Sequence, residues 1–324
     1  MKFTLAIITF NAAATINKCL DSCVSQSYKD LDIIIVDDNS SDNTIEIIQN
    51  YMLKDKRINL IRHTKNKSAL QARKNAVKHA QSQYIWFIDS DDHIVHSAVG
   101  ELSRALKANN YPDMLTFGSN DYNEIGDLKR QFFDWGTNKT LREWKFDSDY
   151  RPYTRITKTE ILKKAADIIP NDLYLYRHND FFMFNLVKLF TGSKAFLKRA
   201  LYNYTLSSTS VTNQKNNDAI SRHVELIDIL LLHYASVAKT INQQEVDIDS
   251  FVNSQKIKLK KYAINQYQSN PSTYLHTLKK LYKYDNKIII SLTTYSKRIQ
   301  TVYKTIESLL KQTLLADKII LWLD

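Results

Sequence analysis

Runs of apolar, β-branched residues alternate with amphipathic segments through the first 95 residues, and this alternation constrains the fold more than any other feature. Strand-length apolar runs occupy residues 3–8, 31–38, 58–63 and 83–92. Apolar residues at helical spacing lie between them, over 16–24 and 68–81 for example. Strands that are buried on both faces and separated by helices form parallel sheets. The pattern therefore predicts an α/β domain with a mostly parallel, Rossmann-like sheet flanked by helices.

Acidic residues gather where two of these runs end. Asp37 and Asp38 end the second run, and Asp89, Asp91 and Asp92 end the fourth. Ligands of open α/β sheets bind outside the carboxyl ends of the strands. Clustered carboxylates repel one another unless a cation neutralises them, and a hard divalent ion would also hold a diphosphate. The alternative for the acidic segment is a solvated turn.

Composition sets the size and the class of partner. The chain has 324 residues, 44% of them hydrophobic, which is enough for one large or two ordinary domains. Its net charge of +11 suggests an anionic partner, such as a nucleotide, a phospholipid surface or nucleic acid. Cys19 and Cys23 lie four residues apart on one expected helix, where reduced core cysteines are the simplest interpretation.

The sequence predicts a cytoplasmic protein. No run of 18 apolar residues occurs, and the apolar run after Lys2 is too short for a signal peptide. The Lys-rich stretch Lys256–Lys283 contains no acid and is a candidate contact with an anionic membrane at its inner face. A solvated helix face with a linker is the alternative. We expect no nucleic-acid partner, because the tyrosines of this stretch form no known RNA-binding motif.

The end of the chain repeats its beginning. The segment SLTTYS (291–296) matches AIITFN (6–11), and an amphipathic helix follows each. Each helix ends near a glutamine, and twelve residues later an aspartate closes an apolar run, at Asp38 and at Asp324. Internal repeats of this kind indicate related domains.

The repeat predicts three parts of the chain. These are an α/β domain over 1–212, a helical extension over 213–285, and the beginning of a second, related domain over 286–324 that is truncated after its second strand. Two strands and one helix bury too little surface to be stable alone. The alternative is that 286–324 completes the first domain.

Four segments together resemble the family-2 glycosyltransferases, which have a GT-A fold. They are IITFN (7–11), CLDSCVSQSYKDLDIIIVDDNSSDNT (19–44), ARKNAVKHAQSQYIWFIDSDD (72–92) and HNDFF (178–182). The resemblance covers residues 2–212, and the segments occur in the family's order and spacing. The chain is similar to bacterial enzymes that add hexoses or N-acetylhexosamines to lipooligosaccharide or capsule. The last 39 residues resemble the start of a second sugar transferase.

The resemblance implies a nucleotide-sugar site at the strand ends. Asp91 would be the direct ligand of Mn²⁺ or Mg²⁺, with Asp89 as its partner toward the ribose or a metal-bound water, and Asp92 behind them. Asp38 would accept a hydrogen bond from the imide N–H of uracil. The remaining residues implied to contact the nucleotide sugar are Thr9, Phe10, Asn11, Arg73 and Ser90. Core packing is the alternative for Phe10, and a surface salt bridge is the alternative for Arg73. Asn39 and Ser40 are expected to shape the turn and to cap the next helix.

The same resemblance implies the catalytic base. Asp180 lies in the HNDFF segment, where a carboxylate would take the proton of the acceptor hydroxyl, and inversion at the anomeric carbon would follow. Asn179 stands where the family usually has Glu, which affects acceptor contacts rather than the base. A helix N-cap is the alternative for Asp180, and His178 is a rival base. Ser68 also departs from the family, which tends to have Gly there.

Acceptor contacts are implied only loosely, and the residues concerned are Trp135, Arg155, His178 and Asn179. A Trp in a loop is as often a packing anchor as a platform for a sugar ring. The segment 201–214 matches the family's closing strand and lid, and no ligand is assigned to it.

The resulting hypothesis is an inverting, metal-dependent transferase. It would move a hexose or N-acetylhexosamine from a UDP-sugar to a hydroxyl of a bacterial surface glycan, free or lipid-linked. The alternative is a non-catalytic nucleotide-sugar-binding module of a larger bifunctional polysaccharide synthase. A nucleotidyltransferase would need a Gly-rich phosphate loop near the first strand, and no Gly precedes Gly100. An RNA-binding adaptor would explain only the charge.

Overall fold

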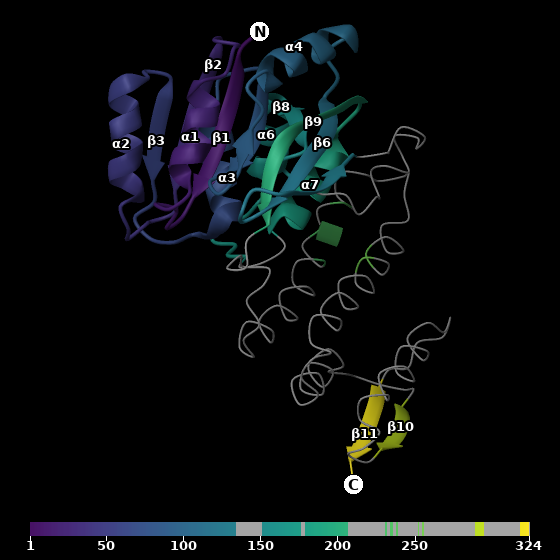
Figure 1. Ribbon diagram of the computed structural model, residues 1–324. Coiled ribbons are helices and arrows are strands. Elements are labelled where there is room, and N and C mark those ends of the chain that lie inside the picture. The colour runs from purple at the N-terminus through teal and green to yellow at the C-terminus, as the bar shows by residue number, and fades with distance from the viewer. Residues whose placement is uncertain are drawn as a thin grey trace. The chain divides into compact units, whose positions relative to one another are not determined.

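The computed structural model describes residues 1–133, 151–175 and 179–206, with isolated residues and two short strands beyond them. The chain divides into two compact units, Met1–Ser210 with Ser236–Val246, and Val211–Ala235 with Asp247–Asp324. Figure 1 shows the first unit as a twisted sheet with helices packed against it. Its nine strands follow the order β3-β2-β1-β4-β8-β6-β9-β5, and β7 pairs with β6.

The first four strands of this sheet are parallel. They are β1 (Phe3–Thr9), β2 (Leu31–Asp37), β3 (Ile58–Arg62) and β4 (Tyr84–Asp89). Strand β1 lies between β2 and β4, and all seven of its residues are buried. Continuous β-branched runs suit this position because both faces of a parallel sheet are covered. The predicted α/β fold with a mostly parallel sheet is confirmed.

The other strands are mainly antiparallel to their neighbours. They are β5 (His93–Ile94), β6 (Met114–Asn123), β7 (Leu128–Phe132), β8 (Arg155–Lys158) and β9 (Lys194–Leu206). Strand β8 joins β4 to β6, and the long β6–β9 pair is parallel. Residues 207–214 of the expected lid lie outside the described residues.

Helices cover both faces of the sheet. They are α1 (Ile16–Val24), α2 (Thr44–Lys54), α3 (Ser68–His79), α4 (Ala98–Ala108), α6 (Thr159–Asp167) and α7 (Asn179–Phe190). One core joins α1 and α4 to the face that carries Phe3 and Trp86. On the other face Phe87 meets Phe184 of α7 edge-on, with ring centroids 5.9 Å apart. Alternate residues of β4 therefore serve two cores.

The cysteine prediction is confirmed, and the capping prediction is wrong in part. Cys19 and Cys23 lie on the buried face of α1, and both are free cysteines in the core. Ser40 shapes the turn, since its backbone N–H donates to Asp37 Oδ2 at 3.1 Å. It does not cap α2, which starts at Thr44. There the backbone N–H donates to Asp42 Oδ1 at 3.1 Å.

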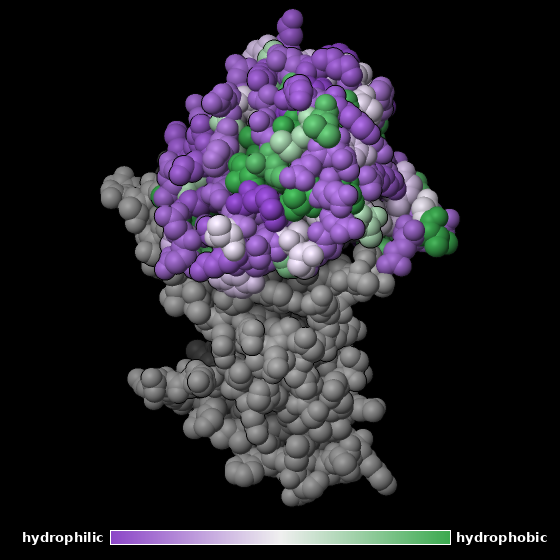
Figure 2. Space-filling model, turned by 90° about the vertical axis from the view of Figure 1, so that its left-hand side faces the viewer, coloured by the Kyte–Doolittle hydropathy of each residue, from purple (hydrophilic) through white to green (hydrophobic). Residues whose placement is uncertain are grey.

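The side of the sheet formed by α2 and β3 carries hydrophobic residues in a hydrophilic surrounding (Figure 2). Leu53 at the end of α2 is 74% exposed, and Met52 beside it is only partly buried. Leu60 and Ile61 of the edge strand β3 are also partly exposed. This surface lies at the edge of the sheet farthest in strand order from β8 and β6.

Two strands near the end of the chain form a separate sheet. Strands β10 (Ile289–Thr294) and β11 (Lys318–Leu323) are parallel and do not join the nine-stranded sheet. Their register repeats that of β1 and β2 under the sequence match, since Ile290–Ile319 corresponds to the pair Leu5–Ile33. The beginning of a second, related domain over 286–324 stays a prediction. The domain boundaries at 212 and 285 lie outside the described residues and stay a prediction.

The backbone conformation at Ser68 is one that favours glycine, the residue that the resembled family tends to have at this position. It is the first residue of α3 and has a φ of 79°, a conformation that L side chains rarely adopt. Its side chain is also buried, and its hydroxyl finds no hydrogen-bond partner among the described residues. Serine carries a Cβ that this left-handed backbone conformation disfavours, so the position is strained.

Replacing Ser68 with glycine should stabilise the protein. Ser68→Gly removes both the steric cost of the left-handed backbone and the unpaired buried hydroxyl. We therefore expect the free energy of unfolding to rise by about 1 kcal/mol in chemical denaturation. Ser68→Ala is the matched control, because it removes the hydroxyl and keeps Cβ. A glycine variant no more stable than the alanine variant would contradict the assignment of strain.

Candidate functional site

The carboxyl ends of the parallel strands meet at one edge of the sheet. Thr9 pairs with Asp37, Asp37 with Arg62, and Ile8 with Asp89. The residues that follow these positions therefore lie close together, although they come from distant parts of the sequence. This edge is where an open α/β sheet binds its ligands.

Two asparagines in left-handed conformations connect the first two strand ends. Asn11 has a φ of 49° and Asn39 a φ of 71°, conformations that Asn tolerates better than most residues. The backbone N–H of Asn11 donates to Ser40 Oγ, and Asn11 Oδ1 accepts from the backbone N–H of Ser41, both at 2.8 Å. The side chain of Asn11 thus holds the loop after β2.

Thr9 and Phe10 differ sharply in exposure. Thr9 is buried at the end of β1, whereas Phe10 is 50% exposed. Core packing, the alternative for Phe10, is therefore wrong. An exposed aromatic ring at the strand edge is free to pack against a planar ligand. Ligand contact by both residues stays a prediction.

Asp38 is held by a partner that the sequence reasoning missed. Asp38 directly follows β2 and is buried, and its Oδ1 lies 2.6 Å from His63 Nδ1. His63 directly follows β3, the strand next to β2. The predicted strand over 58–63 already ended on this histidine. Its position beside Asp38 was the available signal, because neighbouring parallel strands end at the same edge.

The three aspartates of the 89–92 segment have different surroundings. Asp89 ends β4 and is partly exposed, Asp91 is exposed, and Asp92 is buried. Partial desolvation and the neighbouring Asp89 carboxylate raise the pKa of Asp91 to about 6. Ser90 is partly exposed between them. Asp89 and Asp91 are thus the two carboxylates that remain accessible to a ligand.

Tyr202 of β9 holds this acidic turn. Its hydroxyl donates to Asp92 Oδ2 at 2.7 Å and accepts from the backbone N–H of Asp89 at 3.0 Å. The backbone N–H of Thr205 donates to Asp92 Oδ1 at 2.7 Å. Burial, together with the charges of Asp91 and Asp89, raises the pKa of Asp92. Asp92 therefore stabilises the turn itself, from a position behind Asp89 and Asp91.

Arg73 joins the strand end to the start of α7. Its guanidinium is 5% exposed, and its Nη2 lies 3.3 Å from Asp89 Oδ1. Its Nη1 lies 2.5 Å from Asp180 Oδ1 and donates to Asn179 Oδ1. A surface salt bridge, the alternative for Arg73, is therefore wrong. The structure brings together Arg73, Asp89, Asn179 and Asp180 from three elements, α3, β4 and α7.

Asp180 is a partly exposed carboxyl with one buried oxygen. Its side chain is 37% exposed, while Oδ1 is shielded against Arg73. Burial raises the pKa of Asp180, and the charge of Asp89 adds to the rise, whereas Arg73 and Arg155 oppose it. The two arginines favour the ionised form that a proton acceptor requires.

The predicted acceptor residues are placed less completely. Arg155 of β8 is 1% exposed, and its guanidinium lies over the Phe184 ring at 5.3 Å. Arg155 is buried inside the domain rather than in an exposed loop. Its burial therefore argues against a direct contact with the acceptor. Trp135, His178 and the stretch Lys256–Lys283 lie outside the described residues.

Two features are absent from the part of the chain that the structure describes. Among the residues that the structure describes, no group of three or more His, Cys, Asp or Glu side chains could hold a metal ion by itself. Within the same residues, no helix is long and apolar enough to cross a membrane.

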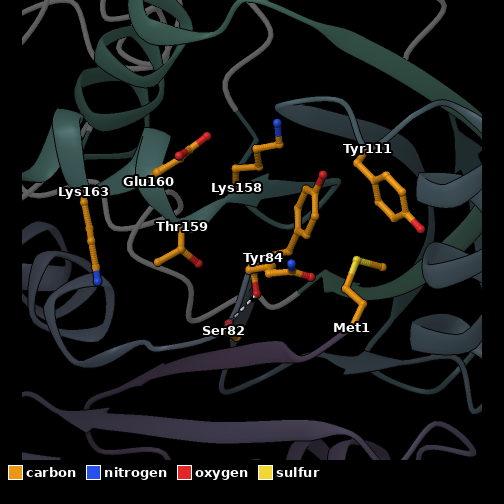
Figure 3. Close-up of a pocket in the computed structure, with 9 residues that line it drawn as sticks. Met1, Ser82, Tyr84, Tyr111, Lys158, Thr159, Glu160 and Lys163 are labelled. Atoms are coloured by element: carbon orange, nitrogen blue, oxygen red, sulfur yellow. Dashed lines mark hydrogen bonds between the residues drawn. The ribbon is translucent and has the colours of Figure 1, made fainter.

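A separate cavity lies away from the acidic edge (Figure 3). It has a volume of about 670 Å³, and its lining includes Met1, Ser82, Tyr84, Lys158 and Thr159. Met1 precedes β1 and Ser82 precedes β4, so the cavity opens at the amino ends of the parallel strands. It contains none of the residues predicted for the nucleotide-sugar site.

Comparison with known proteins identifies the family. Residues 4–188 match the family described as Glycosyl transferase family 2. The chain belongs to this family of glycosyltransferases, and the resemblance in the sequence is confirmed.

One relative and two solved structures illustrate the match. An Escherichia coli UDP-Glc:alpha-D-GlcNAc-diphosphoundecaprenol beta-1,3-glucosyltransferase is 41% identical over 96 residues, 30% of this chain and 38% of that protein. The S. aureus TarS 1-349 structure in complex with UDP-GlcNAc has a TM-score of 0.60 at 18% identity, over 87% of this chain and 80% of that chain. The mannosyltransferase PcManGT from Pyrobaculum calidifontis, in complex with GDP-Man and Mn²⁺, has a TM-score of 0.54 at 13% identity, over 96% and 81%.

These matches define the fold more completely than the activity. The structural likenesses confirm a fold of the GT-A type. The matched segments span less than two thirds of the curated relatives' own lengths. What those relatives act on is therefore evidence for a proposal about this chain.

Removing the hydroxyl of Tyr202 should destabilise the acidic turn. Tyr202→Phe leaves Asp92 Oδ2 and the Asp89 N–H without their partner in a buried place, so we expect unfolding free energy to fall by about 1–3 kcal/mol. Thermal or chemical unfolding measures this change. Tyr204→Phe is the matched control, because this neighbouring hydroxyl makes no hydrogen bond within the described residues. Equal losses in the two variants would count against the turn-holding role.

Proposed function

We propose that this chain transfers a sugar from a UDP-sugar to a hydroxyl group of a bacterial surface glycan, with inversion at the anomeric carbon. One observation supports this above the others. A single buried guanidinium, that of Arg73, contacts both Asp89 of the acidic turn and Asp180 at the start of α7. The residues assigned to the donor and the residue assigned to the acceptor thus belong to one connected site.

Asp180 is proposed to act as the general base. Its Oδ2 side faces outward while Oδ1 rests against Arg73, so one oxygen remains available to an acceptor hydroxyl. A carboxylate on the face opposite the departing diphosphate takes the proton as the oxygen attacks the anomeric carbon. The pairing with Arg73 favours the ionised form, although burial favours the neutral one.

The acidic turn fits a divalent cation. Asp89 and Asp91 present hard oxygen ligands at the strand end, and Asp91 is exposed with a raised pKa, as expected of a carboxylate whose charge is not neutralised. Two carboxylates make an incomplete ligand set, which diphosphate oxygens would complete. A bound Mn²⁺ or Mg²⁺ would stabilise the negative charge of the leaving diphosphate.

The comparisons support the donor and acceptor classes. The names of the E. coli relative and of the TarS complex include UDP-Glc and UDP-GlcNAc. The same relative acts on a diphosphoundecaprenol-linked sugar by its name. These names support our proposal of a hexose or N-acetylhexosamine donor and a glycan or lipid-linked acceptor for this chain.

A binding module without turnover is the second candidate, and Asn179 favours it. This residue stands where the family usually has Glu, and it contacts Arg73. An amide at this position carries no negative charge beside Arg73 and changes the contacts expected for the acceptor, whereas Asp180 keeps its carboxylate. The competing interpretation therefore depends on whether Asp180 alone supplies the base.

Substituting Asp180 should separate these candidates. Asp180→Asn is expected to slow UDP release from the preferred UDP-sugar by a factor of about 10²–10⁴, because the base is lost while donor binding remains. A screen of UDP-sugars, first without acceptor, measures the rate. The exposed Asp172→Asn is the matched control. Equally slow release by the wild type and the Asp180 variant would favour the binding module.

Nucleotide binding should depend on the cation. We expect UDP to bind at least about tenfold more tightly with Mn²⁺ than with EDTA, because the ion links the diphosphate to the carboxylates. Calorimetric titration of the wild type and of Asp91→Asn measures this, and the variant should lose most of the difference. A metal effect that is unchanged in Asp91→Asn would refute the assignment of Asp91.

A further inference from the structure

Asp38 uses one carboxylate oxygen for protein contacts. Its Oδ1 accepts from His63 Nδ1–H at 2.6 Å and from the backbone N–H of Lys67 at 2.8 Å. Its own backbone N–H donates to Thr9 O at 2.9 Å. The side chains of Asp38 and His63 are 4% and 2% exposed, so water does not replace these contacts. The other oxygen, Oδ2, has no protein partner in the described part of the chain.

A third side chain orients the histidine. His63 Nε2 lies 2.6 Å from Asn75 Nδ2, which donates to it. A neutral imidazole has one donor and one acceptor nitrogen, so this contact leaves the proton on Nδ1, facing Asp38. Asn75 belongs to α3, two residues after Arg73. Helix α3 therefore carries the buried Arg73 and, through Asn75 and His63, also holds the carboxylate of Asp38.

We propose that His63, oriented by Asn75, is a positioning residue that sets the nucleotide preference of this site. The inference rests on the proposed function, in which Asp38 faces the nucleotide base. With Oδ1 occupied by two donors, the carboxylate cannot rotate, and Oδ2 alone remains to meet the ligand. That oxygen can only accept a hydrogen bond. It matches the imide N–H of uracil and opposes the unprotonated ring nitrogen that cytosine has at the same position.

The physical basis of the preference is the cost of an unpaired buried group. A site built to hydrogen-bond one ligand group rejects an analogue that lacks it, because the polar groups of the site are left unpaired. This penalty requires a fixed carboxylate. A carboxylate free to turn would expose either oxygen or move toward water, and the preference for uracil would weaken.

A purely structural role predicts a different result. If His63 only fastens the loop 63–67 to the sheet, its loss would weaken the binding of UDP and CDP by the same factor. If it positions Asp38, its loss lowers the ratio of UDP affinity to CDP affinity. The ratio therefore distinguishes the two roles where stability alone does not.

The experiment measures UDP and CDP binding by calorimetry with Mn²⁺ present, using the full chain. For His63→Leu we expect the ratio of UDP to CDP affinity to fall on the order of tenfold. His63→Asn should retain most of the ratio, because its amide N–H can still donate to Asp38 Oδ1. Asn75→Leu should lower the ratio less than His63→Leu does. His79→Leu is the matched control, because His79 is an exposed histidine on α3, the helix that also carries Asn75.

Each outcome decides the proposal. Thermal unfolding checks that the variants fold, and Asn75→Leu tests the idea if His63→Leu does not fold. A folded His63→Leu or Asn75→Leu variant with the wild-type ratio overturns the inference and leaves the proposed transfer intact. A wild type that binds UDP and CDP equally also overturns it, whereas loss of sugar transfer in Asp180→Asn would still support the proposed function.

Discussion

The candidate site depends on one buried cation. Arg73 is 5% exposed on α3, and a guanidinium in such a place must be neutralised by partners at close range. Asp89 comes from β4, and Asn179 and Asp180 come from the first turn of α7. Moving α3 away from both carboxylates would leave the guanidinium buried and unpaired, at a cost of several kcal/mol. The arginine therefore fixes the distance between the acidic turn and the start of α7.

Much of the first half of the fold could be predicted because it follows local rules. The apolar runs of β1 to β4 are long, β-branched and separated by helices, and strands of this kind form a parallel sheet. Their register brings Thr9, Asp37 and Asp89 to one edge. The neighbourhood of Asp38 and the acidic turn follows from that alone. His63 could have been found in the same way, because it follows the adjacent strand.

The contacts among the other site residues could not be predicted, because they join residues that are far apart in the sequence. Tyr202 and Asp92 are 110 residues apart, and Arg73 and Asn179 are 106 apart. These pairs meet only because the antiparallel half of the sheet returns to β4. Its linking strands are short, with two residues in β5 and four in β8. Strands of this length carry no readable period, so the sequence offers no register for them.

The acidic turn shows how surroundings give three neighbouring carboxylates different tasks. Asp92 is taken up by the Tyr202 hydroxyl and the Thr205 N–H, so it serves the turn. One oxygen of Asp89 faces Arg73. Asp91 lacks such a partner within the described residues, and its pKa rises to about 6 as a result of desolvation and of repulsion by Asp89. The residue whose charge the protein leaves uncompensated is the one from which a cation would gain most. Composition alone assigns the same chemistry to all three.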